Sequence, residues 1–207
     1  MYLGGLCFIT DCKACVLTYE DMILRSLKAG VRWVQYRDKE RSKRKVYEES
    51  VKLRRTTKNF NAVFIINDYS DIASAAGADG VHLGQDDLPI REARKIMGDD
   101  KIIGISTHSL EQAMDAERDG ANYIGFGPIF HTMTKDAGSP KGIEMLHEIK
   151  KQVHLPVVAI GGINLENIRL VLDTGSDAVA VASAILRGNI EENVKWFMDI
   201  ISLYDVE

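Results

Sequence analysis

Eight short apolar runs alternate with longer amphipathic stretches along the whole of this 207-residue chain. Several of the runs are apolar throughout and rich in Val and Ile, which is typical of parallel strands buried on both faces. The eight expected strands are Leu6–Thr10, Trp33–Tyr36, Val63–Ile66, Gly80–Leu83, Ile102–Ile105, Tyr123–Phe126, Val157–Ile160 and Ala178–Val181. Helices are expected between them, for example over Tyr19–Lys28, Lys43–Lys58, Leu110–Arg118 and Glu144–Lys151. Residues suited to begin helices as N-caps are Asp68, Ser109 and Asn164.

Four segments of similar sequence join the end of a helix to the start of every second expected strand. In each, a glycine can adopt the left-handed conformation that closes the last turn of a helix. The segments are Ala29–Arg32, Ala76–Asp79, Asp119–Asn122 and Thr174–Asp177. Eight β-α units without a break in composition predict a single-domain (β/α)8 TIM barrel over residues 1–207. An open doubly wound sheet is the alternative, but no G-x-G-x-x-G motif opens the first helix.

The composition limits the classes of protein to which the chain can belong. Its apolar fraction of 45% and charged fraction of 27% are ordinary for a globular protein, and its net charge of -4 is unlike that of a general nucleic-acid binder. No apolar run approaches the ~20 residues that span a bilayer, and the first residues do not resemble a signal peptide. We therefore expect a cytoplasmic protein that binds neither nucleic acid nor membranes. Cys12 and Cys15 form a C-x-x-C, but no second pair of metal ligands exists, so we interpret them as two thiols in a loop.

The active site of a (β/α)8 barrel lies at the C-terminal ends of its strands, so the residues that follow each apolar run are the candidates. Gln35, Arg37 and Lys39 share one face if the extended conformation persists beyond the second strand, because side chains alternate along it. The other candidates are Asn67, Asp68, Asp86, Asp87, Ser106, Thr107, His108, Thr132, Thr134, Lys135, Gly161, Gly162 and Ser183. Three of these lie in the longest connection, from Gly127 to Gly142, which is typical of a lid or binding loop.

These residues divide into two candidate anion sites. The first combines three cations with two carboxylates, as a magnesium–diphosphate requires: Arg37, Lys39, Lys135, Asp68 and Asp87. The second suits a single phosphate, because backbone amides and a helix N-terminus can bind it: Gly161, Gly162 and Ser183. No Cys–His or Ser–His pairing among the rim residues is convincing as a nucleophile and base. A diphosphate that leaves with metal and cationic assistance is therefore the favoured chemistry.

Structural alternatives remain for each of these features. The charged residues after the second strand can form a surface ion-pair cluster, and an aspartate can cap a helix instead of binding metal. Gly161 and Gly162 can mark an ordinary turn, and Ser183 can simply open the next helix. Of the histidines, His108 and His131 are expected in rim loops, His147 and His154 at the surface or in packing positions, and His82 within a strand.

Six segments, in order along nearly the whole chain, closely resemble the signature segments of the thiamine-phosphate synthase family. They are Val34–Lys39, Ile66–Asp68, Gly80–Asp87, Gly127–Lys135, Ala159–Ile163 and Ala182–Ile185. The resemblance implies a transferase that condenses an aminopyrimidine methyl diphosphate with a thiazole phosphate or its carboxylated form. Pyrophosphate would leave to give a pyrimidine-methyl cation, which the thiazole nitrogen captures. Two small departures are His131, where the family commonly has proline, and Ala182, where a bulkier aliphatic residue is common.

The resemblance also implies roles for individual residues. Those expected to hold the pyrimidine diphosphate are Gln35, Arg37, Lys39, Asn67, Ser106 and Lys135, of which Arg37, Lys39, Ser106 and Lys135 would act in catalysis. Asp68 and Asp87 would bind Mg²⁺ as the cofactor. Those expected to receive the thiazole phosphate are Thr132, Thr134, Gly162, Ala182 and Ser183. The implied partners are therefore small-molecule substrates, and whether the chain forms a homo-oligomer stays open.

Two other functions are compatible with the same barrel. A TenI-like thiazole tautomerase would transfer protons and should lack the complete Gln-x-Arg-x-Lys and Thr-x-Thr-Lys sets, both of which this chain has. A non-catalytic regulator that binds thiamine phosphates should have lost a metal aspartate or Lys135, and neither is lost.

Overall fold

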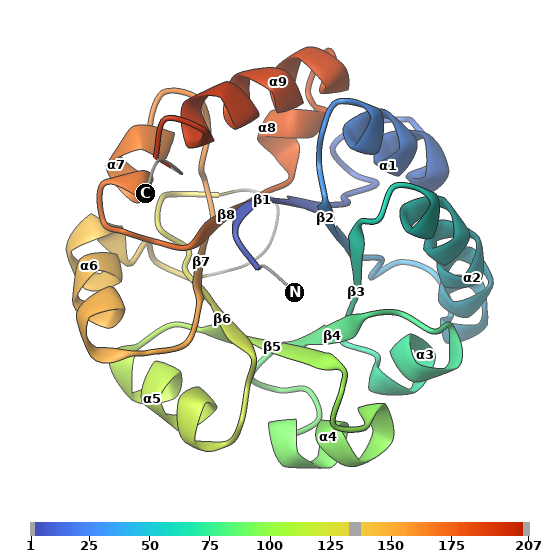
Figure 1. The fold of residues 1–207 in the computed structure, drawn as a ribbon, viewed down its shortest axis with the longest axis horizontal. Coiled ribbons are helices and arrows are strands. Elements are labelled where there is room, and N and C mark those ends of the chain that lie inside the picture. Colours follow the sequence, from blue (N-terminus) through green and yellow to red (C-terminus); the bar gives the residue numbers. More distant parts are fainter. Residues whose placement is uncertain (1–2, 133–137, 205–207) are drawn as a thin grey trace.

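A computed structural model of the chain describes residues 3–132 and 138–204. Eight parallel strands form a closed barrel in which each strand pairs with its neighbours in the sequence and β8 pairs with β1 (Figure 1). This confirms the predicted (β/α)8 TIM-barrel fold and excludes the open sheet. Two of the predicted site residues, Thr134 and Lys135, lie outside the described residues.

The strands lie close to their predicted positions. They are β1 Gly5–Ile9, β2 Trp33–Tyr36, β3 Val63–Asn67, β4 Gly80–Leu83, β5 Ile102–Thr107, β6 Tyr123–Phe126, β7 Val157–Ile160 and β8 Ala178–Val181. β1 begins and ends one residue earlier than predicted, whereas β3 and β5 continue into Asn67 and Thr107. Both polar residues still pair with the neighbouring strand, Asn67 with His82 and Thr107 with Phe126. These two strands therefore extend beyond the ends of their apolar runs.

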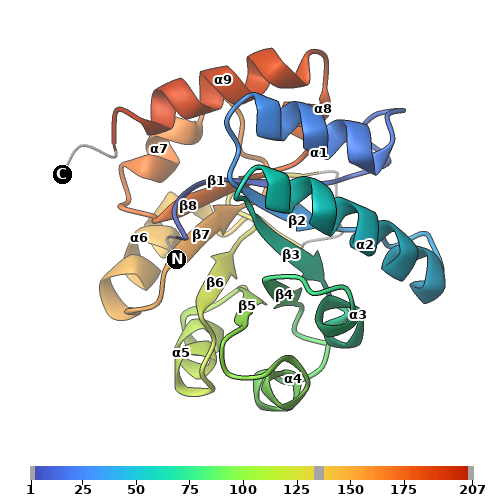
Figure 2. The ribbon, with the colours of Figure 1, turned by 45° about the vertical axis from the view of Figure 1, so that its right-hand side comes forward.

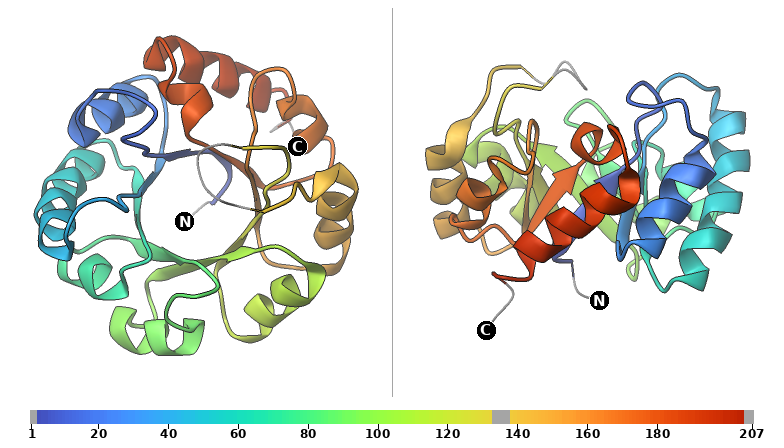
Figure 3. Two further views of the ribbon diagram at one scale, coloured as in Figure 1. Left: turned by 180° about the vertical axis from the view of Figure 1, so that it is seen from behind. Right: turned by 90° about the horizontal axis from the view of Figure 1, so that it is seen from above.

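Helices surround the barrel as an outer ring (Figure 1, and from behind in the left view of Figure 3). In the described residues they are α1 Tyr19–Lys28, α2 Lys43–Asn59, α3 Ser70–Ala75, α4 Ile90–Met97, α5 Leu110–Arg118, α6 Gly142–Gln152, α7 Ile168–Leu172, α8 Ser183–Leu186 and α9 Ile190–Ile201. None of these helices combines the length and apolar character that crossing a membrane requires.

One of the three predicted N-caps is confirmed. Ser109 caps α5, where its hydroxyl oxygen accepts a hydrogen bond from the Gln112 N–H at 3.2 Å. The other two predictions are wrong, because Tyr69 is the N-cap of α3 and Asn167 that of α7. Asp68 instead adopts a left-handed backbone conformation with φ of 67°, and Asn164 accepts backbone hydrogen bonds within the turn that precedes α7.

The core has two parts, because successive side chains of each strand point to opposite faces. Outward-facing side chains pack against the helices, and the largest of them that are fully buried include Phe8, Phe64 and Phe126. Inward-facing side chains fill the barrel itself, where the ring of Trp33 packs edge-on against that of Tyr123 at 5.1 Å between centroids. The barrel is therefore a packed core and no pore.

The last residues of three of the four repeated segments accept hydrogen bonds from a helix and a strand at the N-terminal ends of the strands. Asp79, the last residue of the second segment, accepts two hydrogen bonds from the Arg54 guanidinium and one from the Phe64 N–H, all at 2.8 Å. The pattern recurs with other residues: Asn122 accepts from Arg94 and the Ile103 N–H, and Asp177 accepts from Lys150 and the Val157 N–H. We call the contacts of Asp79, Asn122 and Asp177 the Asx clamps. The first segment has no such contact, because its last residue is Arg32, which donates to the Leu27 and Val31 carbonyls.

The two ends of the barrel are distinct. Figure 2 and the right view of Figure 3 show that β1 begins and α9 ends on the same side of the molecule. The Asx clamps lie at this side, since each clamp residue directly precedes a strand. Because the strands are parallel, all of their C-terminal ends meet at the opposite side. Each clamp ties a helix and two neighbouring strands together at the end of the barrel opposite to the C-terminal ends of the strands.

We expect Asp79→Ala to lower the free energy of unfolding by about 2–4 kcal/mol, because the Arg54 guanidinium and the buried Phe64 N–H lose their acceptor. Asp79→Asn should cost about half as much, because Asn122 shows that an amide oxygen can serve in the same position. Denaturant unfolding of both variants measures the difference.

The control for this series is Glu92→Ala, which removes an exposed pair with Lys95 on one helix face. Its effect should stay below about 0.5 kcal/mol. Equal losses in all three variants would show that the Asx clamps do not stabilise the barrel.

Candidate active site

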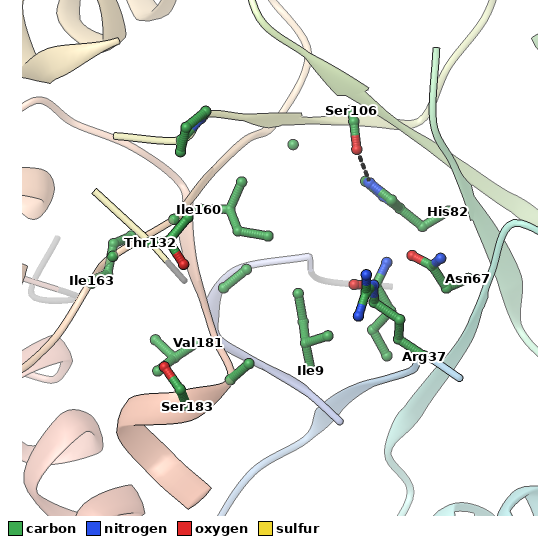
Figure 4. Close-up of a pocket in the computed structure, with 18 of the residues that line it drawn as sticks. Ile9, Arg37, Asn67, His82, Ser106, Thr132, Ile160, Ile163, Val181 and Ser183 are labelled. Carbon is green, nitrogen blue, oxygen red and sulfur yellow. Dashed lines mark hydrogen bonds between the residues drawn. The ribbon is translucent and has the colours of Figure 1, made fainter. Parts of the chain in front are cut away.

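A cavity opens at the C-terminal ends of the strands (Figure 4) and has a volume of about 850 Å³, including its mouth. Nine of the site residues predicted from the sequence line it: Gln35, Arg37, Asn67, Ser106, Thr132, Gly161, Gly162, Ala182 and Ser183. His108, predicted to lie in a rim loop, also lines it. Arg37 and Asn67 lie on one side of the cavity in Figure 4, and Ser183 and Thr132 lie on the other. Its floor is apolar, with Ile9, Ile160 and Val181 among the lining residues.

The loop after β2 places Arg37 at the cavity. The Thr10 hydroxyl accepts a hydrogen bond from the Arg37 N–H at 2.9 Å and donates one to the Arg37 carbonyl at 3.2 Å, which ties this loop to the end of β1. Among residues 3–132 and 138–204, no carboxylate forms an ion pair with the Arg37 guanidinium. A cation without a carboxylate partner at a cavity wall can bind an anionic ligand.

The expectation that Gln35, Arg37 and Lys39 share one face is only partly correct. Gln35 and Arg37 line the cavity, whereas Lys39 does not. β2 ends at Tyr36, and the buried Asp38 carboxylate accepts backbone hydrogen bonds from residues 40 and 41, so a turn interrupts the alternation. The Lys39 ammonium instead forms an ion pair with Asp68 at 2.7 Å.

Asp68 and Asp87 bring two carboxyl groups into contact beside Lys39. Asp87 accepts a hydrogen bond from the Gly84 N–H at 2.6 Å, and Asp68 accepts one from the Asn67 amide at 2.5 Å. Burial raises the pKa of the Asp87 carboxyl; the Gly84 hydrogen bond opposes this shift, and the neighbouring Asp68 adds to it. Adjacent carboxylates repel one another, so a divalent cation between them would be favourable.

A Ser–His contact that the sequence did not predict lies inside the cavity. The Nε2 atom of His82 lies 2.9 Å from the Ser106 hydroxyl (Figure 4). Its Nδ1 atom lies 2.9 Å from the Tyr123 hydroxyl. The sequence placed His82 within a strand, which is confirmed, but assigned it no part in the site. The sequence did contain an indication of this role. His82 lies at a position of β4 that faces the barrel interior, where an apolar residue is expected.

Gly161 and Gly162 form the opposite wall of the cavity, with φ of 98° and 68°. A Cβ atom on Gly162 would lie 2.5 Å from the His131 carbonyl oxygen, so the glycine pair is required by a close approach and is not an ordinary turn. The Asn167 amide donates to the Gly162 carbonyl at 3.0 Å and holds the loop. Ser183 both lines the cavity and is the first residue of the short helix α8.

The remaining histidines lie where the sequence predicted them. The ring of His108 forms a hydrogen bond with the Gly127 carbonyl at 2.6 Å, and His131 lies exposed in the loop after β6. His147 and His154 are exposed as well. Of the two cysteines in the C-x-x-C, Cys12 is exposed and Cys15 half-buried, and both are free thiols in the loop after β1.

A family model described as thiamine monophosphate synthase matches residues 6–185 of this chain. The chain belongs to this family. A thiamine-phosphate synthase from Clostridium acetobutylicum is 45% identical over 200 residues, which cover 95% of this chain and 94% of that protein. One from Methanosarcina barkeri is 46% identical over 85% of this chain and 80% of its own length. The solved structure of a thiamine phosphate pyrophosphorylase from Pyrococcus furiosus superposes with a TM-score of 0.90 at 37% identity, covering 97% of this chain and 96% of that one.

In this member of the thiamine monophosphate synthase family, we expect Gly162→Ala to lower the free energy of unfolding by about 2–4 kcal/mol, because a left-handed alanine is strained and its Cβ would also overlap the His131 carbonyl. Gly175→Ala provides the matched control, since Gly175 has a φ of 78° but no atom within 4 Å of an added Cβ. It should cost only about 1–2 kcal/mol. Denaturant unfolding compares the two, and equal costs would contradict the close approach.

Proposed function

We propose that this chain is a thiamine-phosphate synthase. It joins an aminopyrimidine methyl diphosphate to a thiazole phosphate, and the products are thiamine phosphate and pyrophosphate. The observation that carries the proposal is one cavity with Arg37 and Asn67 at one side and a glycine loop at the other, in a chain 45% identical to a thiamine-phosphate synthase over 95% of its length. The Asp68–Asp87 pair adjoins this cavity, because Asp68 accepts a hydrogen bond from the Asn67 amide. Two phosphorylated substrates would therefore meet over an apolar floor.

The acidic pair fits a magnesium ion that arrives with the diphosphate. No group of three or more His, Cys, Asp or Glu side chains gathers as a metal site in the described parts of the chain. Within those parts, the ligands from the protein would be Asp68 and Asp87. Mg²⁺ is commonly bound by one or two carboxylates together with substrate phosphates and water. When bound, it would stabilise the negative charge that develops on the leaving pyrophosphate.

The chain's own residues would bind and orient the pyrimidine diphosphate. Arg37 and Lys39, with Lys135 as implied by the family resemblance, would contact the phosphoryl oxygens. Gln35, Asn67 and Ser106 would hold the pyrimidine. The bond between the methylene carbon and the diphosphate oxygen breaks, and its electron pair leaves with pyrophosphate. The lone pair of the thiazole nitrogen then forms the new carbon–nitrogen bond with the pyrimidine-methyl cation.

The thiazole phosphate would occupy the opposite wall. Its binding residues would be Thr132, Thr134, Gly162, Ala182 and Ser183. Gly161 and Gly162 have no side chains, so a phosphate could approach their backbone N–H groups closely. The acidic pair would bind its cation beside Lys39 and Asn67, and Asn67 lies across the cavity from Thr132 and Ser183, so the two anionic groups would stay apart.

Three further expectations from the sequence stay predictions. They are a single domain over residues 1–207, a cytoplasmic location, and small-molecule substrates without a nucleic-acid partner. The closure of the barrel between β1 and β8 and the packing of α9 beside α1 support the first.

The test is to supply both substrates with Mg²⁺, to measure pyrophosphate release, and to identify the second product by mass. Release that requires both substrates and yields thiamine phosphate is expected. Binding without release would contradict the proposal, and proton exchange on the thiazole would then test for tautomerase activity.

We expect Asp87→Asn to lower kcat/KM by at least about 100-fold at a fixed Mg²⁺ concentration and to raise the Mg²⁺ concentration that gives half-maximal activity, because the pair loses one anionic metal ligand. The matched control is Asp86→Asn, one residue away and exposed. It should change kcat/KM by less than about twofold. A similar loss in both variants would remove Asp87 from the proposed metal site.

A further inference from the structure

The Ser106–His82–Tyr123 chain of hydrogen bonds can carry its protons in two ways. Either His82 accepts from Ser106 and donates to Tyr123, or it accepts from Tyr123 and donates to Ser106. The first arrangement leaves a lone pair facing the serine, as a nucleophile and its base require. The second makes the imidazole a donor to Ser106 and leaves the serine proton free. The surroundings of Tyr123 decide between them.

Tyr123 lies in the barrel interior and is 2% exposed. In the part of the chain that the structure describes, the His82 ring is the hydrogen-bonding partner of its hydroxyl. Burial raises the pKa of Tyr123 well above its ordinary value, so the residue keeps its proton. A buried O–H without an acceptor is costly, and His82 Nδ1 can accept it only if that nitrogen carries no proton. The proton of the neutral imidazole then lies on Nε2, where it points at Ser106.

The packing around the two rings keeps this arrangement in place. Gly104 of β5 lies against Tyr123, and a Cβ there would overlap the phenol ring. Gly125 of β6 lies beside His82, where an added Cβ would be 3.0 Å from Cε1. Trp33 also packs against Tyr123, with an edge-on ring contact. Two glycines and a tryptophan therefore form a slot for a tyrosine and a histidine in fixed orientations.

We propose that Tyr123, acting through His82, fixes Ser106 as a hydrogen-bond donor toward the cavity, so that Ser106 selects a ligand atom with acceptor character and is not a nucleophile. In a Ser-His-Asp triad a carboxylate accepts a hydrogen bond from Nδ1–H, which leaves a lone pair on Nε2; here a phenol donates a hydrogen bond to Nδ1, which reverses the polarity. Given the proposed function, on which this part rests, the acceptor is a ring nitrogen of the pyrimidine. His82 and Tyr123 are positioning residues, and Ser106 touches the ligand.

The proton arrangement is tested directly, without reference to turnover, by nitrogen NMR of the full chain labelled at its five histidines. The signals of His82 are assigned by their loss in His82→Gln. The expected spectrum at neutral pH shows a protonated Nε2 and an unprotonated Nδ1. A protonated Nδ1, in either a neutral or a cationic ring, would overturn the proposal even if the protein proves to be a thiamine-phosphate synthase.

The donor role is tested by kinetics with the pyrimidine diphosphate. We expect Tyr123→Phe to raise KM about fivefold, the equivalent of one hydrogen bond, and Ser106→Ala to raise it at least as much. Because Tyr123 acts through Ser106, the double variant should be no worse than Ser106→Ala. If the increases in KM of the two single variants multiplied in the double variant, Tyr123 would have a purely structural role. The matched control is Thr174→Val, which removes a buried hydroxyl at the other end of the barrel and should leave KM unchanged.

A fluorophosphonate reagent provides an independent test that needs no substrate. A serine activated by a histidine base is labelled rapidly by such reagents, and Ser106 should not be. Labelling of Ser106 that is lost in His82→Gln would establish a nucleophilic pair and overturn the proposal. If Tyr123→Phe fails to fold, the wild-type NMR spectrum and the labelling experiment still decide.

Discussion

The hydrogen-bonded pairing of β8 with β1 closes the barrel, and the candidate active site depends on that closure. It brings residues 5 to 8 beside residues 178 to 181, so the first and last strands contribute Ile9 and Val181 to the same cavity floor. Because all eight strands are parallel, their C-terminal ends converge on one face. An open sheet of the same strands would leave Arg37 and Ser183 far apart, and two phosphorylated substrates would not meet.

The two ends of the barrel have different physical roles. At the N-terminal ends of the strands, the Asx clamps join helices to strands through partly buried hydrogen bonds that serve stability. At the C-terminal ends, polar groups face the cavity, and the stability lost there is offset elsewhere. Asp68 has a left-handed backbone, and Asp68 and Asp87 hold adjacent carboxyl groups. Adjacent carboxyl groups are unfavourable in the unliganded protein and would become favourable once a cation binds between them.

Much of the fold could be predicted from local patterns, because a strand buried on both faces and an amphipathic helix differ in periodicity within about ten residues. The repeated glycine segments predicted the helix ends, but the Asx clamps could not be foreseen, since Asp79 meets Arg54 across 25 residues. The candidate site was predicted where polar residues follow strands. Lys39 departs from the prediction because a turn at Asp38 directs its side chain to Asp68. The role of His82 could not be predicted, because it lies among apolar neighbours within a strand.

By itself, the sequence determined the number and order of the β-α units, the strands that carry the rim residues, and the family to which the chain is similar. These properties depend on side-chain chemistry and spacing along the chain. Only the tertiary structure decided which of those residues touch. His82 meets Ser106 and Tyr123 from 24 and 41 residues away, and Gly104 and Gly125 make room for the rings. Such contacts depend on the register and closure of the barrel, because a shift of one residue would turn each inward side chain to the opposite face.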